Sequence, residues 1–143
     1  MLPGGAEAPV LRAATVDGQL QVPAQARQVG WWDGGAEAGD PFGSVVLAGH
    51  VDTRTEGLGF FARLRGIRPG EVVVLTGAGH TASYRVASIR AVRKDALATR
   101  SGAFDQTVGH RLVLITCTGA YDASRGGYED NLVVTATAVG LAE

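Results

Sequence analysis

Glycine recurs along the whole of this sequence, and its distribution limits the fold more than any other feature. The chain holds 21 glycines in 143 residues, well above the roughly 7% that is average for soluble proteins. They often flank short apolar runs, as in the segments 43–49 and 70–77. Glycine weakens helix interiors and permits tight turns. Many short strands joined by turns are therefore expected, rather than a bundle of long helices.

Size and charge narrow the class of protein further. A chain of 143 residues is expected to form one domain and to bury a core without metals or disulfides. With 13 Lys and Arg against 14 Asp and Glu, its formal net charge is −1. A nearly neutral chain argues against a nucleic-acid partner. The apolar fraction of 45% is too high for a disordered chain.

The apolar pattern predicts six or more short strands. Continuous or alternating apolar runs predict strands over 44–48, 71–76, 81–92, 112–116 and 132–139. The Asp17-Gly18 pair is typical of a hairpin turn between two short extended runs. The spacing of Phe60, Phe61 and Leu64 predicts one or two helical turns, and another short turn is expected near 95–97. The chain is therefore predicted to be an all-β barrel or sandwich with short helical insertions.

Three segments are predicted to be loops: the first is rich in glycine and proline, the second is mixed in composition, and the third is rich in glycine and aspartate. They cover 23–44, 94–109 and 118–130. Trp31 and Trp32 lie inside the first loop and are expected to pack over an edge of the core. Residues 1–10 are rich in Gly, Ala and Pro and are predicted to be a flexible tail or the remnant of a linker. The folded domain is then expected to cover 11–143.

Two residues at predicted strand ends can carry chemistry. His50 follows the strand 44–48 after Gly49, and Cys117 follows the strand 112–116. If those strands lie side by side, an imidazole and a thiol face one groove. A thiolate can attack a carbonyl, and an imidazolium can protonate the leaving amine. The alternative is that Cys117, the only cysteine in the chain, is a buried and unreactive thiol.

The residues around both candidates resemble those of sortases, and most of all the actinobacterial class F group of these cysteine transpeptidases. Val113-Leu114-Ile115-Thr116-Cys117 is similar to the sortase cysteine motif Thr-Leu-x-Thr-Cys, and Ala48-Gly49-His50-Val51-Asp52 to the segment around the sortase histidine. The segments VDGQLQVP and VGWW stand in the same order before them. The resemblance covers roughly residues 15–140.

This resemblance implies a fold and a reaction. The fold would be an eight-stranded sortase-like β-barrel with short helical insertions. Cys117 would attack a Leu-Pro-x-Thr-Gly (LPXTG) sorting signal between Thr and Gly, forming a thioacyl enzyme. An amine of the peptidoglycan precursor would then resolve it, with His50 as general acid and then base. Thr116 would line the substrate groove.

The family also implies a catalytic arginine, and here the sequence departs from the pattern. Many sortases carry this arginine close to the position of Asn131. The only arginine after Cys117 is Arg125, so the oxyanion role is assigned to Arg125, whose planar charged fork suits a developing negative charge. Asn131 would supply an uncharged donor to the substrate if Arg125 does not reach.

Further expectations concern cofactors, oligomeric state and cellular location. No cofactor and no metal are expected, because the cluster of Asp122, Glu129 and Asp130 matches no calcium loop. Asp52 is expected to begin a turn, and His80 and His110 are expected to be exposed. The resemblance implies a monomer at the extracytoplasmic face of the membrane, held by an N-terminal anchor that the 143 residues do not include.

Two other functions stay open. An L,D-transpeptidase is also a cell-wall cysteine acyl transferase, but its Ser-His-Gly-Cys type of motif differs from Ile115-Thr116-Cys117. A catalytically degenerate sortase-like barrel could instead act as a peptide-binding module. The absence of an arginine near Asn131 keeps this second alternative open.

Overall fold

A computed structural model of the protein describes residues 1–16, 19–53, 55–77, 79–97, 101–122 and 127–140, and for 19, 117–122 and 127–129 it describes the backbone only. Strands dominate the described residues, with two short 3-10 helices between them. In chain order the elements are β1 (Val10–Ala13), β2 (Thr15–Val16), β3 (Gln19–Leu20), β4 (Val29–Trp32), β5 (Ser44–Gly49), β6 (Asp52–Thr53), β7 (Gly57–Leu58), η1 (Phe60–Gly66), β8 (Val72–Gly77), β9 (His80–Arg93), η2 (Lys94–Ala96), β10 (Arg111–Asp122) and β11 (Gly127–Ala138).

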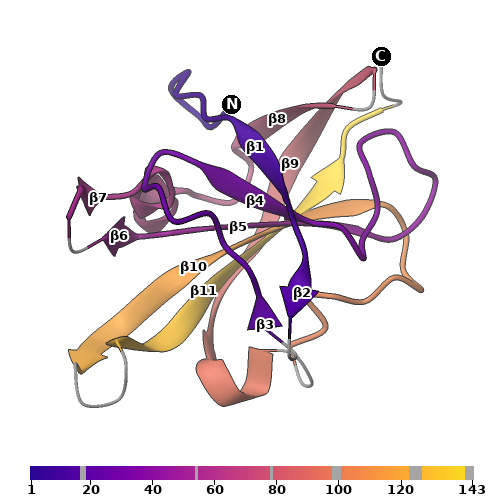
Figure 1. Ribbon diagram of the computed structural model, residues 1–143. Helices are drawn as coiled ribbons and strands as arrows, with labels where there is room; N and C mark the ends of the chain where they lie inside the picture. The colour runs from indigo at the N-terminus through magenta and orange to yellow at the C-terminus, as the bar shows by residue number, and fades with distance from the viewer. Residues whose placement is uncertain (17–18, 54, 78, 98–100, 123–126, 141–143) are drawn as a thin grey trace.

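Seven strands form one curled sheet in the order β1-β4-β5-β10-β11-β9-β8 (Figure 1). The pairs β1–β4 and β5–β10 are parallel, and the other neighbours in this sheet are antiparallel. Two small hairpins, β2–β3 and β6–β7, lie outside it. The prediction of an all-β barrel with short helical insertions is confirmed, with seven strands in the main sheet of the described residues where eight were expected.

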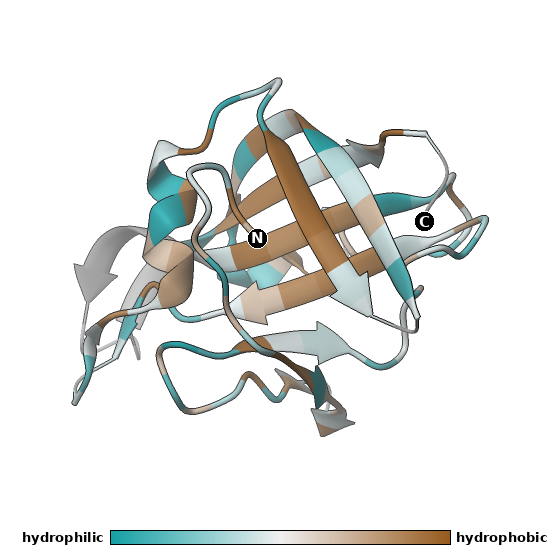
Figure 2. Ribbon diagram, turned by 90° about the horizontal axis from the view of Figure 1, so that it is seen from above, coloured by the Kyte–Doolittle hydropathy of each residue, from teal (hydrophilic) through white to brown (hydrophobic). Residues whose placement is uncertain are grey.

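The two central strands are buried on both faces. Every residue of β5 is buried, and successive side chains of a strand point to opposite faces. Val45 and Leu47 therefore join the larger core, while Val46 and Ala48 join a smaller core on the other face. β10 alternates in the same way, with Leu112 and Leu114 on one side and Val113 and Ile115 on the other. Double burial explains why these strands are continuous apolar runs (Figure 2).

Different elements cover the two cores. The curled sheet encloses the larger core, and η1 adds the buried side chains of Phe61 and Leu64. The segment before β10 covers the smaller core through Ala103 and Phe104. The Phe104 ring meets Trp32 edge to face, with ring centroids 5.1 Å apart.

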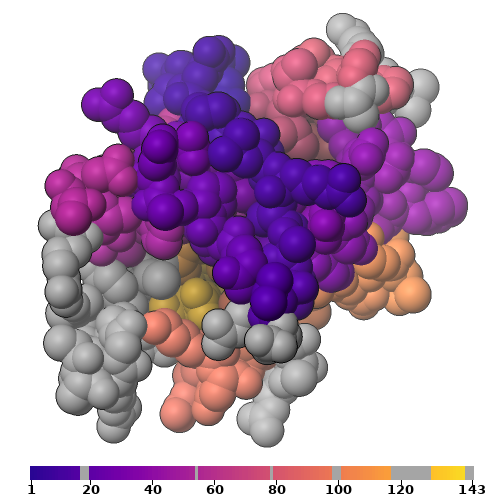
Figure 3. Space-filling model, in the orientation of Figure 1, coloured from indigo at the N-terminus to yellow at the C-terminus, as the bar shows by residue number. Residues whose placement is uncertain are grey.

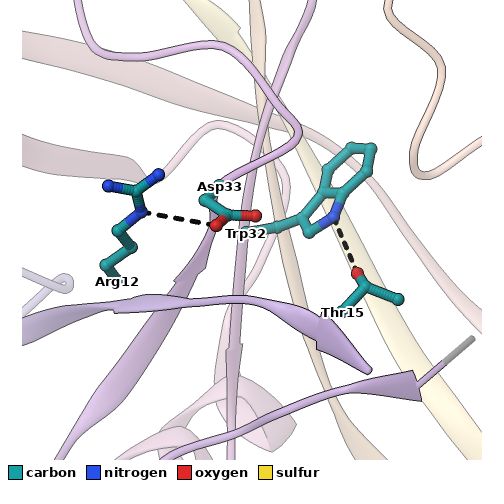
Figure 4. A network of polar contacts seen from close by, with 4 residues as sticks. All are labelled: Arg12, Thr15, Trp32 and Asp33. Carbon is teal, nitrogen blue, oxygen red and sulfur yellow. Dashed lines mark hydrogen bonds and ion pairs between the residues drawn. The ribbon is translucent and has the colours of Figure 1, made fainter. Parts of the chain in front are cut away.

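The N-terminal strands are tied to β4 by polar contacts. The Arg12 guanidinium pairs with Asp33 at 3.3 Å, and Trp32 Nε1 donates to Thr15 Oγ1 at 3.1 Å (Figure 4). Residues of this region lie across the front of the molecule in the space-filling view (Figure 3). Leu2 is 6% exposed and belongs to the larger core. The residues before β1 therefore contact the barrel.

Two predicted loops are wrong in part. Trp31 and Trp32 lie in β4, which pairs with both β1 and β5, although glycine and proline surround them in the sequence. The predicted loop 118–130 is largely a hairpin, because β10 continues to Asp122 and β11 begins at Gly127. Backbone pairing between the two strands holds this polar segment extended without an apolar run.

Within the residues that the structure describes, none of the helices has the length and apolar composition needed to cross a bilayer. The helical turns predicted near residues 60–64 and 95–97 correspond to η1 and η2. The strands predicted on either side of Asp17-Gly18 correspond to β2 and β3, which pair with each other. The turn residues 17 and 18 lie outside the described residues.

Candidate active site

The parallel register of β5 and β10 brings two candidate residues to the same end of the sheet. The strands pair from Ser44 with Arg111 to Ala48 with Ile115. One position further, the Thr116 hydroxyl donates a hydrogen bond of 2.8 Å to the carbonyl oxygen of Gly49. The next residues along the two strands are His50 and Cys117. Both residues therefore follow the β5–β10 pairing at the same end of the sheet.

Cys117 lies inside the long β10–β11 hairpin. Its backbone is opposite Asn131 in the register, and Thr118 is opposite Asp130. The register then shifts between Thr118 and Tyr121. Such a bulge increases the local twist of a strand and changes the direction of nearby side chains. The sheet thus places Asn131 next to the position of Cys117, with an irregularity directly beyond it.

Thr116 joins the two strand ends. Its side chain is 2% exposed, and its hydroxyl is bound to Gly49. A buried hydroxyl needs such a partner, because burying it unpaired costs about 1–3 kcal/mol. Thr116 therefore connects β10 to the end of β5 through this hydrogen bond. The prediction that it also lines a substrate groove stays a prediction.

His50 comes after the last residue of β5, where the first turn of η1 packs against it. A Cβ atom on Gly49 would lie 3.0 Å from the Phe61 ring, so the absence of a side chain lets the ring approach the strand. A Cβ atom on Gly59 would overlap the carbonyl oxygen of His50 and lie 2.8 Å from its carbonyl carbon. The amide of Gly59 donates to Val51 O at 2.9 Å.

Two further segments brace this contact. The amide of Phe60 donates to Ala26 O at 2.8 Å, and the amide of Ala26 donates to a carboxylate oxygen of Glu56 at 3.1 Å. The amide of Glu56 in turn donates to Thr53 Oγ1 at 3.0 Å. The loop before β4, the β6–β7 hairpin and η1 are therefore linked beside His50.

Several predicted site residues lie outside what the structure describes. Arg125 is not among the described residues, and the side chains of Cys117, Asp122 and Glu129 are not described. Asp130 is partly buried, and Asp52 lies in β6 opposite Leu58. No three acidic, histidine or cysteine side chains of the described part of the chain gather where a metal could bind.

The prediction that His110 is exposed is wrong. His110 is half-buried directly before β10, and its Nε2 and the Tyr84 hydroxyl lie 2.7 Å apart. Its Nδ1 is buried and makes no hydrogen bond of standard geometry within the described residues, although the backbone of Phe42 lies near enough to oppose the lowering of its pKa. Burial lowers the pKa of His110, against the opposing charge of Asp40, and burial raises the pKa of Tyr84 to about 12. His80 is exposed, as predicted.

A hollow of about 300 Å³ lies away from these residues. Its lining comes from β1, β4, β5, β8 and the segment between β4 and β5, including Val10, Trp31, Val45, Leu47 and Leu75. Val45 and Leu75 are close to the N-terminal end of β5 and the C-terminal end of β8. His50 and Thr116 are not part of this lining. The hollow is therefore separate from the candidate active site.

The residues that pack around His50 carry little signal in the sequence. Gly59, Ala26 and Glu56 were not singled out, although a glycine directly before the apolar pattern of 60–64 is a recognisable helix start. Their role depends on the close approach of segments far apart in the chain. Only the glycine before the helical pattern offered a signal in the sequence.

Comparison with solved structures identifies the fold. Sortase C-1 from Actinomyces oris is 26% identical, with a TM-score of 0.64 over 80% of this chain and 59% of that one. Sortase C1 from Streptococcus agalactiae is 23% identical, with a TM-score of 0.69 over 97% and 65%. Sortase A from Listeria monocytogenes is 17% identical, with a TM-score of 0.71 over 99% and 85%.

These likenesses show the fold, and the chain spans between about half and two thirds of the length of the two sortase C structures named above and of sortase C from Streptococcus pneumoniae. A search of curated proteins finds no significant match. The family assignment comes from the sortase domain family, which matches residues 4–139. Because this match covers almost the whole chain, the protein belongs to the sortase family.

Proposed function

We propose that the protein is a cysteine transpeptidase that uses Cys117 as nucleophile and His50 as proton carrier. The observation that supports this most is the parallel register of β5 and β10, joined at its end by the Thr116–Gly49 hydrogen bond of 2.8 Å. Membership of the sortase family supports the same reaction class. A fold alone does not imply an activity, so the proposal depends on these residues.

The proposed reaction has two acyl-transfer steps. The Cys117 thiolate attacks the Thr carbonyl of the substrate, and the C–N bond to Gly breaks while the His50 imidazolium gives its proton to the leaving amine. A thioacyl enzyme and a neutral imidazole remain. An amine then attacks the thioester and loses its proton to His50. The C–S bond breaks, so the thiolate and the imidazolium are restored.

A donor must stabilise the negative oxygen that forms in both steps. Arg125 is assigned this role, because a guanidinium suits a developing oxyanion. Asn131 is the alternative donor, and its backbone lies opposite Cys117 on β11. The two roles differ in charge, since an arginine contributes a full positive charge and an asparagine only a dipole.

The substrate and the setting complete the proposal. The resemblance of the His50 and Cys117 segments to class F sortases supports an LPXTG-type sorting signal as the acyl donor and an amine of the peptidoglycan precursor as the acceptor. No metal or organic cofactor enters the steps. The reaction would take place at the extracytoplasmic face of the membrane, with the protein acting as a monomer.

Mass spectrometry tests the acyl-transfer step directly. The protein is incubated with a Leu-Pro-x-Thr-Gly peptide, first alone and then with a small amine. We expect a thioacyl adduct on Cys117 that is converted to the amide product when the amine is present. Cys117→Ala and a peptide of scrambled sequence are the matched controls, and neither is expected to give an adduct.

The opposite result has a definite meaning. If a folded protein gives no adduct with any of a range of LPXTG peptides but binds them, the transpeptidase proposal is wrong. The degenerate peptide-binding barrel would then be the better description. Because the sequence has no arginine near Asn131, the oxyanion role is assigned to Arg125, and this residue would be the first to investigate.

A further inference from the structure

The backbone ladder of the sheet does not hold His50. The β5–β10 pairing ends at Ala48 and Ile115, β5 itself ends at Gly49, and His50 lies outside every strand. The thiol and the imidazole must nevertheless keep a fixed position relative to each other, because a misplacement of about 1 Å in a catalytic group can cost about 10²-fold in rate. The position of His50 must therefore be set by contacts outside the sheet.

Gly59 supplies the closest of these contacts. Its backbone is extended, with φ −85° and ψ 170°, so another residue could adopt this conformation without strain. The restriction is instead steric. A Cβ atom here would overlap His50 O, and would lie 2.8 Å from its carbonyl carbon and 3.3 Å from Ala26 O. All three are backbone atoms, so no side chain can rotate away to make room.

The surrounding hydrogen bonds prevent Gly59 from moving away. Gly59 donates to Val51 O at 2.9 Å, and Phe60 donates to Ala26 O at 2.8 Å. Ala26 is bound to the Glu56 carboxylate at 3.1 Å. Phe61, the next residue of η1, is 2% exposed and anchored in the larger core. An atom added at position 59 would therefore push against His50.

We propose that Gly59 is a positioning residue, which sets the place of His50 relative to Cys117 by backbone contact while Glu56 braces it through Ala26. This inference rests on the proposed function, since it assumes that His50 acts on the Cys117 thiol. Its consequence is that the imidazole can exchange a proton with the thiol only while position 59 carries no side chain.

The test compares two glycines of the same region. Gly59→Ala adds a Cβ atom against His50, whereas Gly66→Ala adds one at the end of η1, where nothing lies within 4 Å. The first readout is the rate of Cys117 alkylation by iodoacetamide as a function of pH, which needs no substrate. The second is the rate of amide formation from the LPXTG peptide and an amine. Urea unfolding reports the folded fraction.

For Gly59→Ala we expect the alkylation profile to move away from that of the unaltered protein and toward that of His50→Ala, in which the thiol has no imidazole partner. Amide formation should fall by about 10²-fold. Gly66→Ala should match the unaltered protein in both measurements. If folded Gly59→Ala keeps the alkylation profile and the transfer rate within twofold, the inference is wrong.

A second pair of variants covers the case in which Gly59→Ala does not fold. Glu56→Ala removes the acceptor of the Ala26 amide, while Glu56→Gln keeps an acceptor oxygen. We expect Glu56→Ala to shift the alkylation profile in the same direction and to lower transfer by about threefold to tenfold, and Glu56→Gln to restore most of it. Equal behaviour of the two variants would also overturn the inference.

Failure of the proposed function has a different signature. If His50 and Cys117 do not work together, His50→Ala leaves the alkylation profile of the unaltered protein unchanged. If only the LPXTG assignment is wrong, the alkylation profile of the unaltered protein still differs from that of His50→Ala, and Gly59→Ala still alters it.

Discussion

The two sides of the candidate active site are held in different ways. On the cysteine side, Cys117 lies within a long antiparallel hairpin, two residues beyond the pairing of β10 with β5, so the pairing with β11 fixes its backbone. On the histidine side, His50 lies beyond the sheet, and Gly59, directly before η1, approaches its carbonyl group while hydrogen bonds link Gly59 and Phe60 to Val51, Ala26 and Glu56. The Thr116–Gly49 hydrogen bond is the described contact that joins the two sides.

This difference predicts how each side responds to mutation. A strand is fixed by a repeated ladder of hydrogen bonds, so one altered side chain changes its backbone little. A residue beyond the ladder depends on a few particular contacts, and one added methyl group can move it. Conservative mutations in the segments around His50 should therefore displace His50 more than similar mutations on the strands around Cys117 displace Cys117.

The largest effects should come from removing the two reacting groups. Cys117→Ala should abolish acyl transfer, because no other thiol is present in the chain. His50→Ala should lower the rate by about 10²–10⁴-fold, the range of general acid–base catalysis. The measurement is the initial rate of amide formation from an LPXTG peptide. Urea unfolding provides the control, since both variants should remain folded.

Substantial transfer by Cys117→Ala would contradict the assignment of the nucleophile. A loss below tenfold in His50→Ala would mean that another base serves the thiol. The two sides of the site would still differ in structure, but this difference would have no role in catalysis.

The next largest effect should come from the oxyanion donor. Arg125→Ala should lower transfer by about 10²–10³-fold, as removal of one such donor does in other enzymes. Asn131→Ala should cost less than tenfold if Arg125 holds this role. The measured quantity is kcat/KM for the peptide. The reverse order of the two losses would give the role to Asn131, which lies opposite Cys117 in the sheet.

Thr116→Val tests the contact between the two sides. Valine keeps the shape of threonine but leaves the buried Gly49 carbonyl without its donor, which should lower the free energy of unfolding by about 1–3 kcal/mol. Transfer should fall as well, because Gly49 precedes His50. Urea denaturation and transfer rates measure the two effects. Thr137→Val, on the exposed part of β11, is the matched control.

If Thr116→Val loses neither stability nor activity, the hydrogen bond to Gly49 does not join the two sides. If it loses binding of the peptide while its stability is unchanged, the predicted contact of Thr116 with the substrate gains support instead.

The smallest effect should be a pH dependence away from the site. Burial lowers the pKa of His110 from 6.5, so below pH 6.5 the unfolded chain binds more protons than the folded one. Stability should therefore be fully present above that pH and fall as the pH decreases toward the folded pKa. Urea midpoints measured between about pH 8 and pH 5 should show this loss.

His110→Gln should reduce the loss, whereas the same change at the exposed residue His80 should leave it unaltered. An identical pH dependence in His110→Gln and the unaltered protein would show that burial of His110 does not couple to folding. In both variants the rate of acyl transfer should equal that of the unaltered protein, because His50 and Cys117 are unchanged.

The central part of the fold could be predicted because its strands carry their own signal. Val45–Ala48 and Leu112–Ile115 are continuous apolar runs, as expected for strands buried on both faces. β9 was predictable from its alternation. The β10–β11 hairpin beyond Cys117 was not, because its glycine and aspartate residues are typical of loops and only pairing between the strands keeps them extended.

The candidate site was predictable in its residues and not in its support. His50 and Cys117 follow apolar strands and lie in recognisable motifs. The contact of Gly59 with His50 joins residues through a turn of the chain, and the contacts of Ala26 with Glu56 and Phe60 join more distant ones. Such contacts leave no periodic pattern of residues in the sequence from which they could be predicted. The pairing of His110 with Tyr84 was missed for the same reason.

The parallel pairing of β5 with β10 also has a consequence for the order of folding. The Thr116–Gly49 contact spans 67 positions of the chain, whereas β10 and β11 are neighbours in sequence and pair through a short connection. Closing a long loop is slower and costs more entropy than closing a hairpin. We therefore expect Cys117 to reach its ordered surroundings before His50 joins it. An incompletely folded chain would then expose an unpaired thiol, and pulsed hydrogen exchange should show β10 and β11 protected earlier than β5.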